Sequence, residues 1–285
     1  MSNIILKQGD CLELMKELPD ESVDAVITSP PYNVDLGNNK FNSCPYDLYN
    51  DNKEHKEYIK WLREIFDLLF RKLVKGGRVC INIGDGKNGA VPTQSDIIQT
   101  MKEIGYIPLT HIIWDKKNVA NRTAWGSFAS PSSPSFPTPF EHILIFCKET
   151  NKLQKEGTAD ITNEEFIKWT LAIWEFTGQG KEAYKNGKLG TPLLHPAAFP
   201  IELPYRLIKL LTYKSDTILD PFLFPVMKPY SCYAEYLAWR ACQDYVKLAY
   251  LSYAFDFKYV LYYVWLEFRL YIQRSYSMPS VLEGS

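Results

Sequence analysis

The chain of 285 residues has few cysteines and histidines and almost no net charge. Its six cysteines form no Cys-x-x-Cys pair and have no metal-ligand spacing with the four histidines. We therefore expect free thiols in a reducing compartment and no metal site. A net charge of −1 gives no overall basic field, so any contact with nucleic acid must come from local lysines and arginines.

We expect neither a secretion signal nor a membrane span. The apolar piece near the N-terminus is only three residues long, too short for the core of a signal peptide. The most apolar window, near residues 248–268, is interrupted by Asp256 and Lys258. Because 46% of the residues are apolar, the chain can build a substantial core, and we expect a cytoplasmic α/β protein.

The clearest motif is a corner with two prolines that follows an apolar run. Residues 23–27 are typical of a short buried strand, and the sequence TSPPYN follows at residues 28–33. Neither proline can donate a backbone hydrogen bond, so the strand must stop there in a stiff, extended conformation. The corner offers two acceptors, the Ser29 hydroxyl and the Pro30 carbonyl, and the ring of Tyr32 for stacking. This set suits the exocyclic amino group of a nucleobase; the alternative is a turn whose tyrosine only packs.

Residues 27–33 resemble the catalytic motif of the DNA amino-methyltransferases, which transfer a methyl group from S-adenosylmethionine to N4 of cytosine or N6 of adenine. The resemblance implies catalytic roles for Ser29, Pro30, Pro31 and Tyr32. A serine in the first position resembles the cytosine-N4 group more than the adenine group, which usually has Asp or Asn there. The implied partners are double-stranded DNA and, in a restriction–modification system, a restriction endonuclease acting on the same site.

Three further segments resemble the cofactor-binding segments of this family. The first is Gly9-Asp10-Cys11, where Asp10 is equally suited to capping a predicted helix over residues 11–17. The second is HPAAFP at residues 195–200, although His195 can also be a loop residue before a helix. The third follows a short predicted strand over residues 217–219. The resemblance assigns cofactor contacts to Asp10, Cys11, His195, Pro196, Phe199, Pro200, Glu202, Asp220 and Phe222.

The periodicity of apolar residues predicts helices over 11–17, 53–73, 95–105 and 201–211. It predicts strands over 3–7, 23–28, 78–84, 109–114, 141–148 and 217–219. Gly76 and Gly77 are expected to end the second helix, and Ser95 lies at or near the expected cap of the third. The catalytic corner precedes the cofactor segments, which resembles the β arrangement of these enzymes. We therefore expect a permuted, doubly wound, mostly parallel α/β sheet of the Rossmann-like methyltransferase type.

Four regions are expected along the chain. Residues 1–149 form the catalytic half of the sheet, and residues 193–223 carry the cofactor segments. Between them, residues 150–192 correspond to the family's target-recognition region, around a predicted helix over 164–174. Basic and aromatic residues interleave in the irregular segment 115–139, which predicts DNA contact, with a solvated loop as the alternative. The residues predicted to contact DNA are Lys116, Lys117, Arg122 and Trp125.

The fourth region, residues 224–285, lacks what the family resemblance requires. The family continues from its Asp-Pro-Phe segment into a glycine-rich cofactor loop, whereas here Leu223 is followed by FPVMKP. No glycine occurs between Gly190 and Gly284. A shifted reading frame, a fusion or a deletion would each produce such a tail, in which one or two helices are expected. Because this loop is missing, one alternative to an active DNA enzyme is an impaired remnant that keeps DNA binding. A second alternative is an RNA or protein methyltransferase that uses the same corner.

Overall fold

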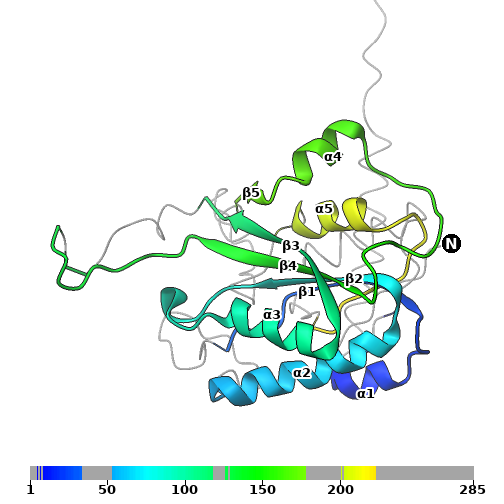
Figure 1. Cartoon of the computed structure of the whole chain (residues 1–285), viewed down its shortest axis with the longest axis horizontal. Coiled ribbons are helices and arrows are strands. Elements are labelled where there is room, and N and C mark those ends of the chain that lie inside the picture. The colour runs from blue at the N-terminus through cyan, green and yellow to red at the C-terminus, as the bar shows by residue number, and fades with distance from the viewer. Residues whose placement is uncertain are drawn as a thin grey trace, which may run out of the picture.

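One mixed sheet organises the computed structural model, which describes residues 5, 7, 9–33, 53–117, 126–127, 129–177, 200 and 202–222 (Figure 1). The strands of this described part are β1 (Val23–Thr28), β2 (Leu73–Ile83), β3 (Tyr106–Asp115), β4 (Phe140–Lys148), β5 (Ile173–Glu175) and β6 (Ile218–Leu219). The helices are α1 (Cys11–Lys16), α2 (His55–Lys72), α3 (Thr93–Ile104), α4 (Asn163–Trp169) and α5 (Glu202–Leu211), with a 3₁₀ turn, η2 (Lys87–Gly89).

The strands lie in the order β5-β3-β4-β2-β1-β6. Strands β6, β1 and β2 pair in parallel, β3 and β5 pair in parallel, and β4 is antiparallel to both of its neighbours. The carboxyl ends of β1, β2, β3 and β6 therefore meet the amino end of β4 at one edge of the sheet. The predicted α/β class with a mostly parallel sheet is confirmed, since only β4 runs against the others. In such sheets ligands bind at this carboxyl edge.

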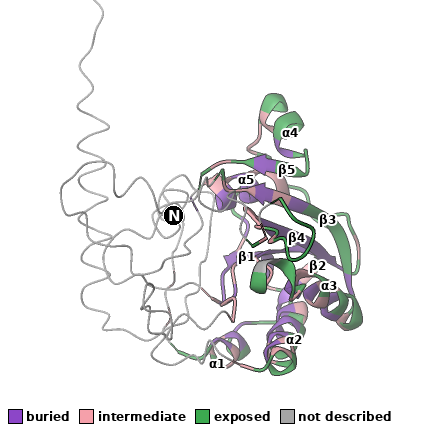
Figure 2. Ribbon diagram, turned by 90° about the vertical axis from the view of Figure 1, so that its left-hand side faces the viewer, coloured by how far each residue is buried: buried purple, intermediate pink, exposed green. Residues whose placement is uncertain are grey.

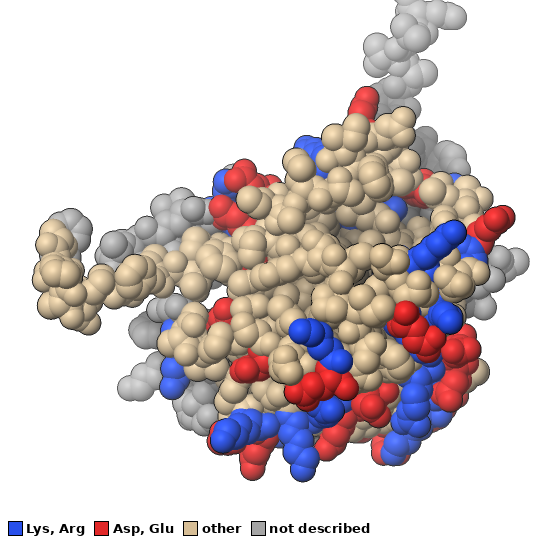
Figure 3. Space-filling model, in the orientation of Figure 1, with Lys and Arg blue, Asp and Glu red and all other residues tan. Residues whose placement is uncertain are grey.

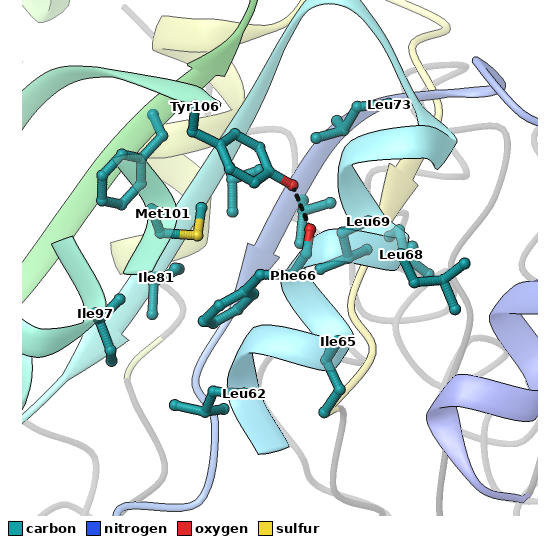
Figure 4. Packing of buried hydrophobic residues seen from close by; sticks show 14 of the residues in the cluster. Leu62, Ile65, Phe66, Leu68, Leu69, Leu73, Ile81, Ile97, Met101 and Tyr106 are labelled. Carbon is teal, nitrogen blue, oxygen red and sulfur yellow. Dashed lines mark hydrogen bonds between the residues drawn. The ribbon is translucent and has the colours of Figure 1, made fainter. Parts of the chain in front are cut away.

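Helices α1, α2 and α3 cover one face of the sheet (Figure 1). The apolar stripe of α2 includes Leu62, Ile65, Phe66 and Leu69, all fully buried in one cluster with residues of β2 (Figure 4). Each such side chain contributes roughly 1.5–3 kcal/mol through the area it removes from water. Tyr106 at the start of β3 donates a hydrogen bond of 2.9 Å to the Phe66 carbonyl, as Figure 4 shows, which fixes α2 against the sheet.

Helix α5 lies on the opposite face, so β1 and β6 are buried between two layers, whereas much of β3 is exposed (Figure 2). Leu203, Leu207 and Ile208 of α5 form a second cluster with Ile27 and Ile218 of the adjoining strands. The guanidinium of Arg206 lies over the rings of three aromatic residues, at 5.6 Å from Trp169, 5.2 Å from Trp174 and 4.8 Å from Phe176. These cation–π contacts join α5 to the segment that carries α4 and β5.

The prediction that Gly76 and Gly77 end a helix is wrong. Helix α2 ends at Lys72, and both glycines lie inside β2. Val23 pairs with Leu73 but Ala25 pairs with Arg78, so the residues between them bulge out of the ladder. Gly76 has φ +77°, and a Cβ atom there would lie 2.4 Å from the Lys152 carbonyl oxygen. The glycine is required by the bulge and by the passing chain.

Two other predicted elements differ from the structure. Ser95 is the third residue of α3 and not its cap; the Asp85 carboxylate accepts the Gln94 N–H at 3.0 Å instead. The helix predicted over 164–174 ends at Trp169, and Trp174 belongs to β5, where it pairs with Trp114. Pairing with β3 thus overrides the local helical pattern. The strand predicted over residues 3–7 and the tail after residue 223 lie almost wholly outside the described residues.

On the face shown in Figure 3, lysines and arginines are interspersed with acidic residues over α1 and α2. The segment 129–139, which extends away from the sheet in Figure 1, contains no charged residue. This face therefore shows no surface of one sign for a phosphate backbone. Among the described residues, no helix combines the length and the apolar character that crossing a bilayer requires.

Candidate active site at the carboxyl edge of the sheet

The corner with two prolines leaves β1 at its carboxyl end, as its sequence predicts. Pro30 is buried, whereas Ser29, Pro31 and Tyr32 are partly buried. Tyr58 of α2 donates a hydrogen bond of 2.7 Å to the Pro31 carbonyl. The backbone of Asn33 has a left-handed conformation, with φ 56°. Its side chain makes two hydrogen bonds, of 2.8 and 2.9 Å, to the backbone of Lys53. The corner is therefore held on both sides by the start of α2.

Ser29 and Tyr32 share a hydrogen-bond network with buried residues of β2 and β4. Ser29 Oγ donates to the backbone carbonyl of Asn82 at 3.1 Å and lies 3.3 Å from the Tyr32 oxygen. The Tyr32 hydroxyl donates to Glu141 Oε2 at 3.0 Å and accepts from Asn82 Nδ2 at 2.8 Å. Burial, and then the charge of Glu141, raise the pKa of Tyr32 well above its ordinary value, so Tyr32 stays neutral.

Two acceptors of the corner remain available to a ligand. The hydrogen of Ser29 is directed at the Asn82 backbone carbonyl or at the Tyr32 oxygen, so a lone pair of the Ser29 oxygen can accept from a ligand. Within the described part of the chain, no group donates to the Pro30 carbonyl. The Tyr32 ring lies over Gly84, where a Cβ atom would come within 3.2 Å of Tyr32 Cε2. The absence of a side chain at residue 84 therefore leaves the room that this ring occupies.

Asp220 adjoins the corner because β6 pairs with β1. It is 3% exposed and accepts hydrogen bonds from Thr28 Oγ1 at 2.5 Å and from the Phe222 N–H at 3.0 Å. Burial raises the pKa of Asp220 from 3.8 to about 7. The Phe222 ring lies 5.6 Å from the ring of Trp61 on α2, between centroids. The structure thus brings two separately predicted segments, the catalytic corner and Asp220–Phe222, to the same place.

The other predicted cofactor residues have structural partners of their own. The Asp10 carboxylate caps α1, accepting from the N–H groups of Leu12 and Glu13 at 2.8 and 3.3 Å, so its capping role is confirmed. Cys11 is buried, and burial is the main reason why its pKa rises to about 12.

At the start of α5, the Pro200 carbonyl accepts the Leu203 N–H at 3.1 Å, and Glu202 pairs with Arg206 at 2.7 Å. Three of the predicted cofactor residues lie outside the described residues: His195, Pro196 and Phe199.

Lys116 and Lys117, predicted to contact DNA, already have carboxylate partners. Lys116 Nζ pairs with Glu141 Oε1, and Lys117 Nζ lies 2.8 Å from Glu175 Oε1. A lysine held by a carboxylate is less available to a phosphate, so the structure lends these two predictions no support. Arg122 and Trp125 lie outside the described residues.

Sequence reasoning missed the polar residues that support the corner. Asn82 and Glu141 were assigned only to strands, although each is a polar residue in an otherwise apolar, buried run. His142 is a further buried polar residue of β4, and it lies 3.2 Å from Asp85 Oδ2 and 2.8 Å from the ring nitrogen of His111. A buried polar residue in a core strand needs a partner, and that requirement was the available signal.

Known proteins resemble this chain over the part that carries the corner. A family model for N6 and N4 methyltransferases, described as DNA methylase, matches residues 23–223. This chain belongs to the DNA amino-methyltransferase family. The match ends at the residue after which the sequence departs from the family pattern.

Two archaeal relatives of this methyltransferase come from Methanocaldococcus jannaschii. The Type II methyltransferase M.MjaVI is 38% identical over 184 residues, covering 64% of this chain and 90% of its own. The Type II methyltransferase M.MjaI is 33% identical over 239 residues, covering 73% and 77%.

Solved structures share the fold of the methyltransferase. The putative DNA modification methylase TTHA0409 of Thermus thermophilus has a TM-score of 0.63 at 22% identity, over 97% of both chains. Another structure of that protein, with a TM-score of 0.60 at 20% identity over 96% of both chains, is complexed with S-adenosyl-L-methionine. The PvuII DNA methyltransferase, which is cytosine-N4-specific, has a TM-score of 0.59 at 19% identity, over 99% of this chain and 89% of its own.

Proposed function

We propose that this chain moves a methyl group from S-adenosylmethionine to the exocyclic amino group of a base flipped out of double-stranded DNA. Cytosine N4 is favoured over adenine N6, and the reaction serves a restriction–modification system. The observation that carries the proposal is the hydrogen bond between Thr28 and Asp220. It places the segment predicted to bind the cofactor directly beside the corner predicted to hold the base.

The corner supplies what an exocyclic amino nitrogen needs in order to react. The lone pair of such a nitrogen is delocalised into the base ring, so the nitrogen is a poor nucleophile. Ser29 Oγ and the Pro30 carbonyl each accept a hydrogen bond from the amino group. These two bonds turn the lone pair of the nitrogen out of the ring plane. Both bonds strengthen as the nitrogen becomes positive, so they stabilise the transition state more than the ground state. The nitrogen gives one hydrogen to water as a proton once it carries the methyl group, and no covalent enzyme intermediate is needed.

Tyr32 stacks on the flipped base. Stacking of this kind is worth about 1–3 kcal/mol, which offsets much of the few kcal/mol needed to take a base out of the helix. The ring is partly buried and its hydroxyl is turned inward to Glu141. A stacking ring that is anchored at its hydroxyl loses little freedom when the base arrives.

The described residues at the end of β6 fit the cofactor. Asp220 is a buried carboxyl whose donors are both uncharged, an arrangement typical of functional sites and suited to a cationic sulfonium ligand. The cofactor supplies the activated methyl group. Asp220 and Phe222 would hold it on one side, with Asp10 and Cys11 near its adenine. Its methionine part would bind at the segment of His195, Pro196, Phe199, Pro200 and Glu202.

Serine at the first position of the corner supports cytosine as the target, and the Type II relatives support a restriction–modification role. The test uses tritium-labelled S-adenosylmethionine and unmethylated phage DNA, followed by digestion to nucleosides. Label in N4-methylcytosine is the expected result, and Ser29→Ala should abolish it. Ser22→Ala is the matched control, because Ser22 lies just before β1 at the other edge and its hydroxyl donates to the Pro19 carbonyl. Label in N6-methyladenine would show that adenine and not cytosine is the target base. Label in RNA or protein would show that the substrate is not DNA.

A second candidate function, an impaired remnant that still binds DNA, has one specific observation in its favour. The family match ends at Leu223, and the next residues, FPVMKP, replace the glycine-rich loop that lets the backbone approach the cofactor. Calorimetry with S-adenosylmethionine separates the two candidates. Heat that saturates with cofactor supports the active enzyme, whereas no heat together with retained binding to duplex DNA supports the remnant.

A further inference from the structure

Glu141 is a buried acid next to the proposed site that the mechanism above does not use. It lies near the start of β4 and is 5% exposed. Three donors surround its carboxylate: the Tyr32 hydroxyl at 3.0 Å, Asn82 Nδ2 at 2.8 Å and the ammonium of Lys116. Burying a carboxylate is costly unless it is paired in this way. Because a buried carboxylate needs all of these partners, we expect Glu141 to have a function in the corner beside it.

The chemistry of the donors fixes the direction of each hydrogen bond. The amide nitrogen of Asn82 and the ammonium of Lys116 can only donate, so Glu141 accepts from both and has no hydrogen of its own to give. Tyr32 must therefore donate its single hydroxyl hydrogen to Glu141. The lone pairs of the Tyr32 oxygen are left to face Asn82 Nδ2 and Ser29.

Ser29 then has only acceptors on its inner side. The Asn82 carbonyl lies at 3.1 Å and the Tyr32 oxygen at 3.3 Å. Whichever of the two receives the Ser29 hydrogen, that hydrogen points into the protein. One lone pair of Ser29 Oγ then faces the other inner oxygen, and the second is left for the incoming amino group.

We propose that Glu141 is a positioning residue that sets the direction of the chain Ser29–Tyr32–Glu141, so that Ser29 meets the amino group of the base as an acceptor. This inference rests on the proposed function. In Glu141→Gln the new amide nitrogen can donate to the Tyr32 oxygen. The Tyr32 hydrogen is then free to turn to Ser29 and to take up one of the two lone pairs of Ser29 Oγ, which leaves this oxygen a weaker acceptor for the amino group of the base.

The kinetic test is a double-variant cycle on unmethylated phage DNA with Glu141→Gln, Tyr32→Phe and the combination of both. Glu141→Gln should lower kcat by about tenfold or more while KM for DNA stays within about twofold. The combined variant should be no slower than Tyr32→Phe, because without the hydroxyl there is no chain to direct. Glu149→Gln is the matched control: Glu149 follows the other end of β4, is paired with Lys75 at 3.6 Å, and should leave kcat unchanged.

A second readout does not need catalysis. Fluorotyrosine placed at residue 32 reports the surroundings of its hydroxyl by fluorine NMR. Its resonance should shift in Glu141→Gln and stay in place in Glu149→Gln. Additive kinetic effects, a change in KM alone, or an unmoved resonance would each overturn the role of Glu141. If the unaltered protein methylates no DNA, the proposed function fails, while the NMR result still decides whether Glu141 directs Tyr32.

Discussion

Thr28 Oγ1 donates a hydrogen bond of 2.5 Å to Asp220 Oδ1, joining the ends of two neighbouring parallel strands that are 192 residues apart in the sequence. The Asp220 carboxyl is buried at this junction, and burial disfavours its charged form. Its pKa is therefore about 7 in the folded protein, against an ordinary value of 3.8. The folded state holds this proton more tightly than the unfolded state does.

This difference predicts how stability depends on pH. A group whose pKa is raised by folding contributes stability that is fully present below its unfolded pKa and is lost as pH rises through its folded pKa. The contribution of Asp220 should therefore fall between pH 3.8 and about 7. A shift of this size corresponds to at most about 4 kcal/mol. Asp220→Asn keeps both accepted hydrogen bonds and should remove this dependence.

Urea unfolding from about pH 5 to about pH 8 checks the prediction. Relative to the unaltered protein, Asp220→Asn should gain stability up to about pH 7, and the difference should stay constant above that pH. A stability difference between the two proteins that is independent of pH would show that the carboxyl is already charged at the lower end of the range.

Tyr58 fixes the corner from α2, so its hydroxyl should matter to catalysis as well as to stability. Tyr58→Phe removes the donor of the 2.7 Å bond to the Pro31 carbonyl and leaves the ring in the core. We expect a loss of about 1–2 kcal/mol in the free energy of unfolding, because a partly buried carbonyl loses its partner. Methyl transfer should fall as well, since Pro30 and Tyr32 on either side gain freedom.

Tyr106→Phe is the matched control. Tyr106 is equally buried in the core and donates a bond of 2.9 Å to the Phe66 carbonyl, far along α2 from the corner. Its loss should cost similar stability and leave kcat unchanged. Equal loss of activity in both variants would mean that general destabilisation, and not the position of the corner, explains the effect of Tyr58.

The corner and its surroundings were predictable from the sequence where the signals are local. The residues TSPPYN end β1 because of the two prolines, and Asp10 caps α1 because a carboxylate just before a helical turn can reach its free N–H groups. The adjacency of Asp220 followed from the family resemblance, which implies that both segments share one site. The pairing of β1 with β6 then confirmed that adjacency.

What was missed depends on contacts between distant parts of the chain. Glu141 is 109 residues from Tyr32, and no local pattern links them. Gly76 resembles a helix terminator in sequence, but its need for a positive φ comes from a bulge against β1 and from the chain passing at Lys152. Trp174 continues the helical pattern of the preceding residues in the sequence, but in the structure it pairs with Trp114 in the sheet. In each case the partner that decides the conformation is absent from the local window.

The bulge at Gly76 gives a prediction for folding alone. Gly76→Ala combines a positive φ with a Cβ atom 2.4 Å from a backbone oxygen, so the chain must shift. We expect a loss of at least about 2 kcal/mol by urea unfolding. Gly105→Ala is the control, because Gly105 also has a positive φ, +117°, but its nearest neighbour would lie 3.6 Å away. A smaller loss at residue 105 would show the part due to crowding; equal losses would assign the whole effect to the backbone.

The space under Tyr32 gives the most selective prediction for function. In Gly84→Ala the new methyl group would lie 3.2 Å from Tyr32 Cε2, so the ring must move by a few tenths of an ångström. Because the ring is anchored through its hydroxyl, such a move also disturbs the distance between Tyr32 and Ser29. We expect methyl transfer to fall by about tenfold, since small misplacement of a positioning group is costly in rate.

Gly86→Ala is matched to Gly84→Ala in crowding and in place. Its new Cβ atom would also lie 3.2 Å from a neighbour, but that neighbour is Val91 Cβ, in the turn before α3. The two variants should therefore lose similar stability, while only Gly84→Ala loses activity. If Gly86→Ala is slowed as much as Gly84→Ala, the turn as a whole supports the site and the close approach of Tyr32 to residue 84 has no special role.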